Sequence, residues 1–415
     1  MAILKPFKGL RPPKNIAKQI ASRPYDVINS EEAAKEAEGN QYSFLRVVKP
    51  EIELPADTDL YSQAVYNKAV GNLAKFTQQG WLKQDETPNY YVYAQSWGPK
   101  MQYGIVGLAG IEDYLTNIIK KHELTRPDKE EDRMKHVRNT KANAEPVFFS
   151  YPASDAIDEV VKQVIKADPE YDFVADDGFG HKLWVVSNPA TVSQLEKLFA
   201  KVPAFYVADG HHRTAAAALV GNELKNQNPK HTGTEPYNYF MAVLFPDNQL
   251  TIIDYNRVVK DLNGLTKDEF LNRLEKVFEV VQHGPQQYKP SALHHFSMYL
   301  EGNWYALKAK PGTYNDDDPI GVLDVTILSK HVLDNILGIK NLRTDKRVDF
   351  VGGIRGLGEL QQLVDSGRMK VAFALHPVTM KQLIDIADSG NIMPPKTTWF
   401  EPKLRSGLVV YKFDK

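Results

Sequence analysis

One segment, YVADGHHRTAAAALVG at positions 206–221, constrains the fold more than any other. Apolar and aromatic residues lead into Asp209-Gly210, and four alanines run from Ala215 to Ala218. The pattern predicts a strand over 204–208 that turns directly into a helix, because alanine favours helix and lets a helix pack closely against a sheet. A strand followed at once by a sheet-packed helix indicates a mixed α/β (α+β) fold.

Polar chemistry fills the turn between this strand and helix, from Asp209 and Gly210 through His211 and His212 to Arg213. The first N–H groups of a helix have no partner within it, and the helix dipole adds positive potential, so the turn is suited to bind phosphate. Gly210 would let a ligand approach the backbone, and Arg213 could fork onto phosphate oxygens. A structural role stays open, in which Asp209 caps the helix and Arg213 pairs with an acid.

Metal binding by the two adjacent histidines is the weaker interpretation of this turn. Neighbouring residues on a helix point about 100° apart. The histidine pair of a zinc-binding helix instead lies at i and i+4, on one face.

Composition excludes several classes of protein. The chain has 415 residues, a net charge of −1 and no cysteine. A length of this order predicts two or three domains, and the charge argues against a nucleic-acid-binding protein. The lack of cysteine excludes disulfides, thiolate metal ligands and thiol nucleophiles. No apolar run approaches the length of a membrane helix or a signal peptide, so we expect a cytoplasmic protein with no membrane partner.

Periodicity and turn signals predict the remaining elements. We expect helices over 59–80, 155–167, 191–201, 266–280, 322–337 and 379–389. We expect strands over 89–97, 102–111, 181–187, 238–246, 250–259, 304–309 and 370–377. Asp247-Asn248 would join the strands at 238–246 and 250–259 into a pair.

Two further polar segments are candidates for the same site. His122-Glu123 follows the apolar pair Ile118-Ile119, and Arg133 lies in the charged stretch beyond it. A glutamate beside a phosphate site is suited to act as a general base, although a solvated charged face is the alternative.

The other segment, PPKTTWFEPKLRSGLVVY (394–411), is held by prolines as a fixed loop rather than a helix. We expect it to line the cleft through Lys396, Thr397, Lys403 and Arg405. The alternative is a polar approach to a C-terminal strand. Arg23 and Asp26, in SRPYDVI, are cleft candidates of the same kind or a structural pair.

Seven segments spread over 23–407 together carry a family resemblance: RPYDVI, KKHELT, KEEDR, ADGHHR, YNRVV, LDVTILSKHVLDNILGI and KTTWFEPKLRSG. With them the chain resembles a large bacterial family that is grouped with the ParB/sulfiredoxin-like fold and linked to free-serine kinases. In that superfamily a Gly-x-x-Arg turn at a helix N-terminus binds nucleotide phosphates, and Gly210 to Arg213 matches it. The reductase chemistry of sulfiredoxin needs a cysteine and is excluded here.

The resemblance implies roles for single residues. An Asp-Gly-x-His-Arg motif holds the nucleotide in the similar serine kinases, and Asp209, Gly210, His212 and Arg213 match it. A glutamate upstream accepts the proton of the serine hydroxyl, and Glu123 is our candidate. We add His122 to the predicted catalytic residues, and His211 and Thr214 to the predicted nucleotide-binding residues.

We therefore predict an N-terminal segment at 1–85, a ParB/sulfiredoxin-like nucleotide-binding core at 86–262 and a C-terminal α+β module at 263–415. The predicted function is a kinase that uses ATP or ADP and Mg²⁺ to phosphorylate the hydroxyl of a small metabolite, free L-serine first. Asp209 would orient the Mg²⁺ or the hydroxyl. The alternative is a nucleotide-binding switch or scaffold that turns over no metabolite. An amino acid is the expected partner, nucleic acid is not, and a homo-oligomer stays open.

Overall fold

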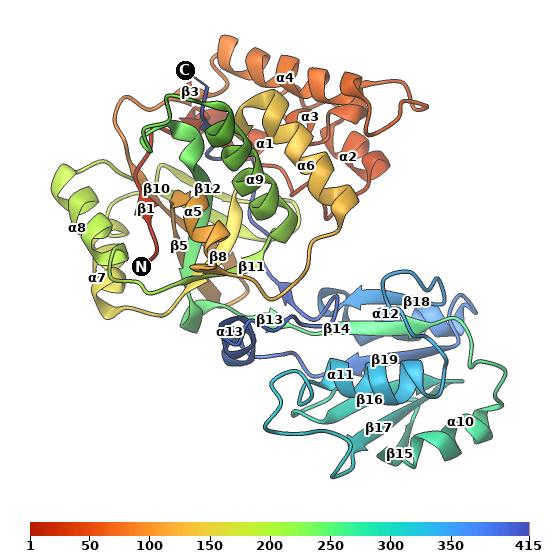
Figure 1. Cartoon of the computed structure of the whole chain (residues 1–415). Helices are drawn as coiled ribbons and strands as arrows, with labels where there is room; N and C mark the ends of the chain where they lie inside the picture. Colours follow the sequence, from red (N-terminus) through yellow and green to blue (C-terminus); the bar gives the residue numbers. More distant parts are fainter. Residues whose placement is uncertain (415) are drawn as a thin grey trace. The chain divides into compact units, whose positions relative to one another are not determined.

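The computed structural model describes residues 1–414, and the chain divides into two compact units (Figure 1). The first unit comprises Met1–Leu250 and Pro402–Lys415, and the second comprises Thr251–Glu401. Both units combine helices with sheets, so the predicted α/β class is confirmed. The assignment of a ParB/sulfiredoxin-like core to 86–262, between two flanking modules, stays a prediction.

A nine-stranded mixed sheet forms the centre of the first unit. Its order is β6-β11-β8-β12-β5-β4-β10-β9, with β1 paired to β5. The strands are β1 (Leu4–Lys5), β4 (Tyr90–Trp97), β5 (Lys100–Gly110), β6 (Ile119–Lys120), β8 (Val147–Tyr151), β9 (Tyr171–Val174), β10 (Gly180–Val186), β11 (Phe205–Asp209) and β12 (Tyr239–Pro246). Two short ladders join β2 (Leu10–Arg11) to β3 (Lys83–Gln84) and β7 (Ala142–Asn143) to β21 (Tyr411–Lys412).

Helices cover this sheet and extend the first unit beyond it. They are η1 (Lys14–Ile16), α1 (Ala17–Ile20), α2 (Ser30–Ala37), α3 (Leu45–Val48), η2 (Pro50–Glu53), α4 (Gln63–Gln78), α5 (Ile111–Leu115), α6 (Pro127–Thr140), α7 (Asp155–Val164), α8 (Pro189–Phe199), α9 (His211–Gln227), η3 (Pro236–Asn238) and η4 (Asp247–Gln249). Among residues 1–414, no helix is both long and apolar enough to cross a membrane.

Helix α9 is buried on two opposite sides, as its alanine content predicts. Ala215, Ala217 and Ala218 belong to the core that the sheet shares with α5, α7 and α8. Ala216 and Val220 pack on α6 instead (Figure 1). A helix with apolar residues all round is stable only inside a protein, and small side chains let both neighbours come close.

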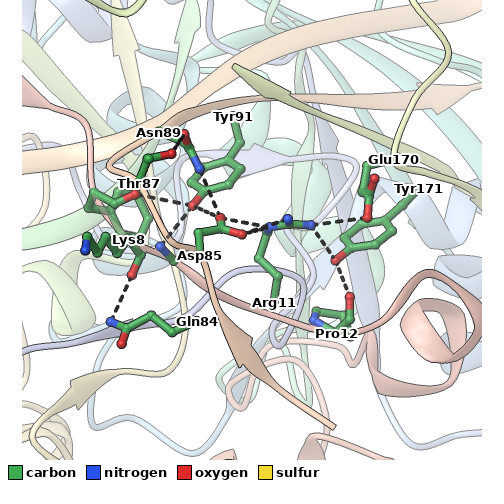
Figure 2. Close-up of polar contacts among 12 residues, drawn as sticks. Lys8, Arg11, Pro12, Gln84, Asp85, Thr87, Asn89, Tyr91, Glu170 and Tyr171 are labelled. Atoms are coloured by element: carbon green, nitrogen blue, oxygen red, sulfur yellow. Dashed lines mark hydrogen bonds and ion pairs between the residues drawn. The ribbon is translucent and has the colours of Figure 1, made fainter. Parts of the chain in front are cut away.

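The N-terminal segment is fixed to the sheet by a polar network around Arg11 (Figure 2). Its guanidinium forms an ion pair of 2.8 Å with Asp85 and donates to the hydroxyl of Tyr171 at 3.2 Å. The Tyr91 hydroxyl donates to Asp85 at 2.6 Å and accepts from the Gly9 N–H at 2.9 Å. These bonds join β2, β4 and β9, so the predicted N-terminal segment is an integral part of the first unit.

The second unit contains a six-stranded sheet of order β15-β17-β16-β19-β14-β18 and a separate β13–β20 ladder. Its strands are β13 (Ile252–Ile253), β14 (Tyr255–Val259), β15 (Phe278–Gly284), β16 (His295–Leu300), β17 (Asn303–Ala309), β18 (Val348–Gly352), β19 (Val371–Leu375) and β20 (Trp399–Phe400). Its helices are α10 (Lys267–Leu274), α11 (Asp324–Leu328), the π-helix η5 (Ser329–Asp334), η6 (Gly353–Arg355), α12 (Gly356–Asp365) and α13 (Met380–Asp388).

Two predictions about local structure were wrong. The strands expected at 238–246 and 250–259 do not pair: β12 lies between β8 and β5, whereas β14 lies between β19 and β18. Residues 247–249 form the turn η4, and the chain then passes into the second unit. The helix expected over 266–280 ends at Leu274, because Phe278 and the β-branched Val280 and Val281 that follow belong to β15.

Substitution of two helical glycines would test the close packing of α9. A Cβ on buried Gly221 in α9 would lie 2.4 Å from the Tyr237 carbonyl oxygen, whereas nothing lies within 4 Å of a Cβ on exposed Gly71 in α4. We expect Gly221→Ala to lower the free energy of unfolding by about 1–3 kcal/mol through overpacking. Gly71→Ala should raise it by about 0.5–1 kcal/mol through helix propensity. Urea unfolding of both variants measures the difference, and a stabilised Gly221→Ala would contradict the described packing.

Candidate functional site

The turn between β11 and α9 has a conformation that only glycine adopts easily. Gly210 precedes the helix with φ of 83°, and His211 is the first helical residue. A Cβ on Gly210 would also lie 3.2 Å from the guanidinium of Arg213. Gly210 therefore permits both the left-handed turn and the packing of Arg213 against the backbone.

Asp209 does not cap α9. No side chain caps the helix, and Asp209 Oδ1 instead accepts from the N–H of Gly210 at 2.8 Å. The N–H and the hydroxyl of Thr214 both donate to the Gly210 carbonyl, each at 2.9 Å. An N-terminus without a side-chain cap keeps the positive end of the helix dipole available to an anion.

Lys403 reaches this turn from the C-terminal part of the first unit. Its Nζ lies 3.0 Å from Asp209 Oδ2. Burial alone would raise the pKa of Asp209, but Lys403 and Arg213 outweigh it and hold that pKa well below its usual value. Asp209 is thus ionised at neutral pH, and Lys403 is the residue of the predicted loop that meets the DGHHR motif.

Arg213 is buried behind the turn, with 7% of its surface exposed. Its Nη1 donates to the Pro146 carbonyl at 2.7 Å, and its Nη2 lies 3.9 Å from Asp26. Burial alone would lower the pKa of Arg213, but Asp26, Glu145 and Asp209 outweigh it, so the guanidinium stays charged. Its position gives it the role of a fixed positive charge beneath the helix N-terminus.

A second buried arginine, Arg133 on α6, lies near Glu145, the same acid that acts on Arg213. Its Nη1 lies 3.8 Å from Glu145, and its Nη2 lies 2.7 Å from Asp132. Its guanidinium also stacks 4.0 Å from the ring centre of Tyr25. Burial raises the pKa of Glu145 against the opposing effect of Arg213 and Arg133. A small cavity touches both arginines and Glu145, together with His136, Asn143 and Met241.

Sequence reasoning missed Glu145. Its Oε1 accepts from the Tyr25 N–H at 2.9 Å and from the Ser406 hydroxyl at 3.3 Å. The one available signal was an acid directly before Pro146 and the apolar run of β8. That signal does not predict the partners of Glu145, because Tyr25, Arg133 and Ser406 are not its neighbours in sequence.

His122 and Glu123 lie beside the turn because β6 and β11 are parallel neighbours, with Ile119 opposite Phe205. Parallel strands end at the same edge of a sheet, so the residues after β6 meet those after β11. The rings of His122 and His211 are 4.5 Å apart, and Glu123 lies within 4.8 Å of a nitrogen of each. Burial and the neighbouring His211 lower the pKa of His122 to about 3, and burial lowers the pKa of His211 to about 4.

His212, Arg23 and Arg405 were also predicted to belong to the site, and each has a different partner. His212 accepts from the Arg126 N–H at 3.0 Å, which fixes the start of α6 to the turn. Arg23 pairs with Glu36, its Nε donating at 2.8 Å, and Arg405 pairs with Asp177 and His181 instead of with the turn.

Lys396 and Thr397 belong to the second unit. There Lys396 lies over the ring of Tyr255 at 5.7 Å, and the Thr397 hydroxyl donates to Pro394 at 2.6 Å. The cleft role of these two residues stays a prediction.

The sequence profile of a family described as "Protein of unknown function (DUF1015)" matches residues 4–326 of this chain. No curated protein matches its sequence. Similar solved structures include a free serine kinase in complex with AMP, 13% identical over 72% of this chain and 86% of that one, with a TM-score of 0.35. A conserved hypothetical protein from Pyrococcus furiosus is 14% identical over 73% and 93%, with a TM-score of 0.35.

A third similar structure is C-terminally truncated SbnI from Staphylococcus aureus, 9% identical over 71% of this chain and 82% of that one, with a TM-score of 0.30. Of these three structures, one contains AMP and one is the named protein SbnI. Likenesses with such low TM-scores carry no argument about activity, which has to come from the residues of the site.

Buried His136 predicts a pH dependence of stability. Burial and nearby Arg133 lower its pKa to about 4, while an unfolded chain has a histidine pKa of about 6.5. The unfolded state therefore binds the extra proton, and stability falls as pH falls from about 6.5 to about 4, by up to about 1.4 kcal/mol per pH unit for this residue. Urea unfolding between pH 7.5 and 4.5 measures the slope.

We expect His136→Gln to reduce that slope by up to one proton. His231→Gln changes a less buried histidine by the same chemistry and controls for general effects of the substitution. Equal slopes for wild type and His136→Gln would show that His136 is not the source.

Proposed function

The chain belongs to the DUF1015 family, and we propose that this member transfers a phosphoryl group from a nucleotide to the hydroxyl of a small metabolite at the β11–α9 turn. The observation that supports this most directly is the parallel pairing of β6 with β11. It brings Glu123, a candidate proton acceptor, to the same sheet edge as Gly210 and Arg213, the candidate phosphate site.

The phosphates would be held at the N-terminus of α9. That end carries no side-chain cap, and Gly210 leaves the backbone open to a close approach. Arg213 supplies charge from beneath the turn, and Lys403 supplies a second cation at its side. Phosphoryl transfer needs this kind of fixed positive potential, because the transferred group carries charge on its equatorial oxygens.

Mg²⁺ would bind through Asp209, which is the residue of the turn with a carboxylate. Nucleotide-bound Mg²⁺ is usually held by one or two carboxylates together with phosphates and water, so a single ionised aspartate fits. When bound, the ion would neutralise charge on the phosphates. Lys403 now occupies Oδ2 of Asp209 at 3.0 Å and would have to move from that oxygen to the phosphates.

Glu123 would accept the proton of the hydroxyl. It is half-buried, and His122 and His211 beside it have strongly lowered pKa values, so both rings are neutral at pH 7. The two rings beside Glu123 therefore carry no charge that would compete for its proton. Free L-serine is the first candidate substrate, on the strength of the sequence resemblance to free-serine kinases.

The proposal is tested by incubating the pure protein with ATP or ADP, Mg²⁺ and L-serine, and then with pooled amino acids. Mass spectrometry should detect a phosphorylated amino acid that forms only when both protein and nucleotide are present. Nucleotide binding without any new phosphomonoester would favour the switch or scaffold and would reject the transferase.

Two substitutions should fail in different ways. Glu123→Gln keeps the shape but cannot accept a proton, so turnover should fall by roughly 10²–10⁴-fold with nucleotide affinity nearly unchanged. Arg213→Lys loses the planar fork that bonds to Pro146 and should weaken nucleotide binding and turnover together. Calorimetry with the nucleotide and initial rates separate the two effects.

Matched controls come from surface ion pairs of the same unit. Glu112→Gln and Arg138→Lys repeat the chemistry of the two substitutions at residues that pair with Lys225 and Glu223. Both should leave binding and turnover close to wild type. Full activity of Glu123→Gln would transfer the base role to another acid, with Asp209 the first to test.

A further inference from the structure

His122, Glu123 and His211 form a compact group of ligand-type side chains from two separate segments. His122 and Glu123 follow β6, and His211 begins α9. One nitrogen of each ring and one carboxylate oxygen of Glu123 lie within 4.8 Å of one another. The two imidazole planes stand almost perpendicular, at 85°. Three ligand-type groups from two segments thus lie within one small volume.

A second observation concerns the burial of His211. The residue is 7% exposed, and its Nε2 has no hydrogen-bond partner. A buried polar atom without a partner costs about 1–3 kcal/mol. A cation bound at Nε2 would remove that penalty, and His211 lies in the same group of ligand-type atoms as His122 and Glu123.

His122 has the outer contact expected of a metal ligand. It is 1% exposed, and its ring hydrogen-bonds to the backbone of Val207. Metal-binding histidines commonly donate their other ring N–H to a backbone carbonyl or a carboxylate, which fixes the tautomer and the ring orientation.

We propose that His122, Glu123 and His211 bind a divalent transition-metal cation of the Zn²⁺ or Fe²⁺ class. Two imidazole nitrogens and one carboxylate are a donor set for these ions, whereas Mg²⁺ and Ca²⁺ prefer oxygen ligands. Three protein ligands leave at least one coordination position for water or a substrate oxygen. Half-buried Glu123 provides the side from which the ion enters.

Metal binding at this site is independent of the proposed phosphotransfer. The two proposals share one residue, since a carboxylate that binds a cation is no longer a free proton acceptor. Bound Zn²⁺ should therefore inhibit a transferase that uses Glu123 as its base. Mg²⁺ at Asp209 should persist, because that ion prefers oxygen donors.

The test uses the full chain, stripped of metal by a chelator and dialysed, with no nucleotide present. Calorimetry with Zn²⁺ and visible absorption with Co²⁺ should both report about one ion per chain, also in excess Mg²⁺. Loss of an outer contact already costs about 10–100-fold in metal affinity, so Glu123→Ala and His211→Gln should each lose at least that much. Glu123 is half-buried, so its variant keeps the experiment interpretable if the His211 variant folds poorly.

The matched control is His231→Gln. His231 pairs with Glu235 at 3.0 Å and is another histidine–carboxylate pair of the first unit. Its replacement should leave Zn²⁺ and Co²⁺ binding unchanged. The proposal is overturned if wild type binds neither ion, or if binding survives both site variants. Phosphotransfer is measured separately on the stripped and dialysed protein, with Mg²⁺ added and Zn²⁺ absent, so either proposal can fail alone.

Discussion

The first unit depends on balancing the buried guanidinium of Arg213. A buried charge needs partners, and breaking such a pair from one side typically costs about 3–5 kcal/mol. Asp26, Glu145 and Asp209 provide the balance, and each comes from a different part of the chain. Glu145 in turn accepts hydrogen bonds from Tyr25 and Ser406, so the N-terminal segment, the residues that precede β8 and the C-terminal segment all meet at this acid. The shape of the turn above it follows from this arrangement.

The parallel pairing of β6 with β11 is the second constraint on the site. Because β6 and β11 end together, one sheet edge carries two kinds of chemistry: an uncapped helix N-terminus beside ionised Asp209, and a cluster of two neutral imidazoles with a carboxylate. The first attracts anions and the second attracts soft or borderline cations. Glu123 belongs to the second group, so the two roles proposed for it, proton acceptor and metal ligand, would compete directly.

Local sequence patterns predicted part of the fold and of the candidate site. Alternating and apolar runs predicted the strands β4, β5, β10, β11, β12, β14, β17 and β19, but they did not predict β8, β15, β16 or β18. Asp209-Gly210 before four alanines predicted the turn and the buried helix, since these depend on neighbouring residues alone. The end of the helix expected over 266–280 was a local error, and the other failures involved distant partners. The chain leaves one sheet after β12 and enters another at β14, which turn signals at 247–248 cannot reveal. Likewise, Lys403 and Arg405 look equivalent in sequence, but only Lys403 contacts Asp209, because Asp177 and His181 bind Arg405. Glu145 was missed since its role lies wholly in non-local contacts.

The discontinuity of the first unit has a consequence for biosynthesis. Lys403, Ser406 and β21 follow the whole second unit in sequence, yet they complete the surroundings of Asp209, Glu145 and β7. A ribosome adds about 5–20 residues per second, so the 151 residues of Thr251–Glu401 delay these contacts by roughly 8–30 s. During translation, Asp209 in the nascent sheet therefore stays without its lysine partner until the second unit has been synthesised.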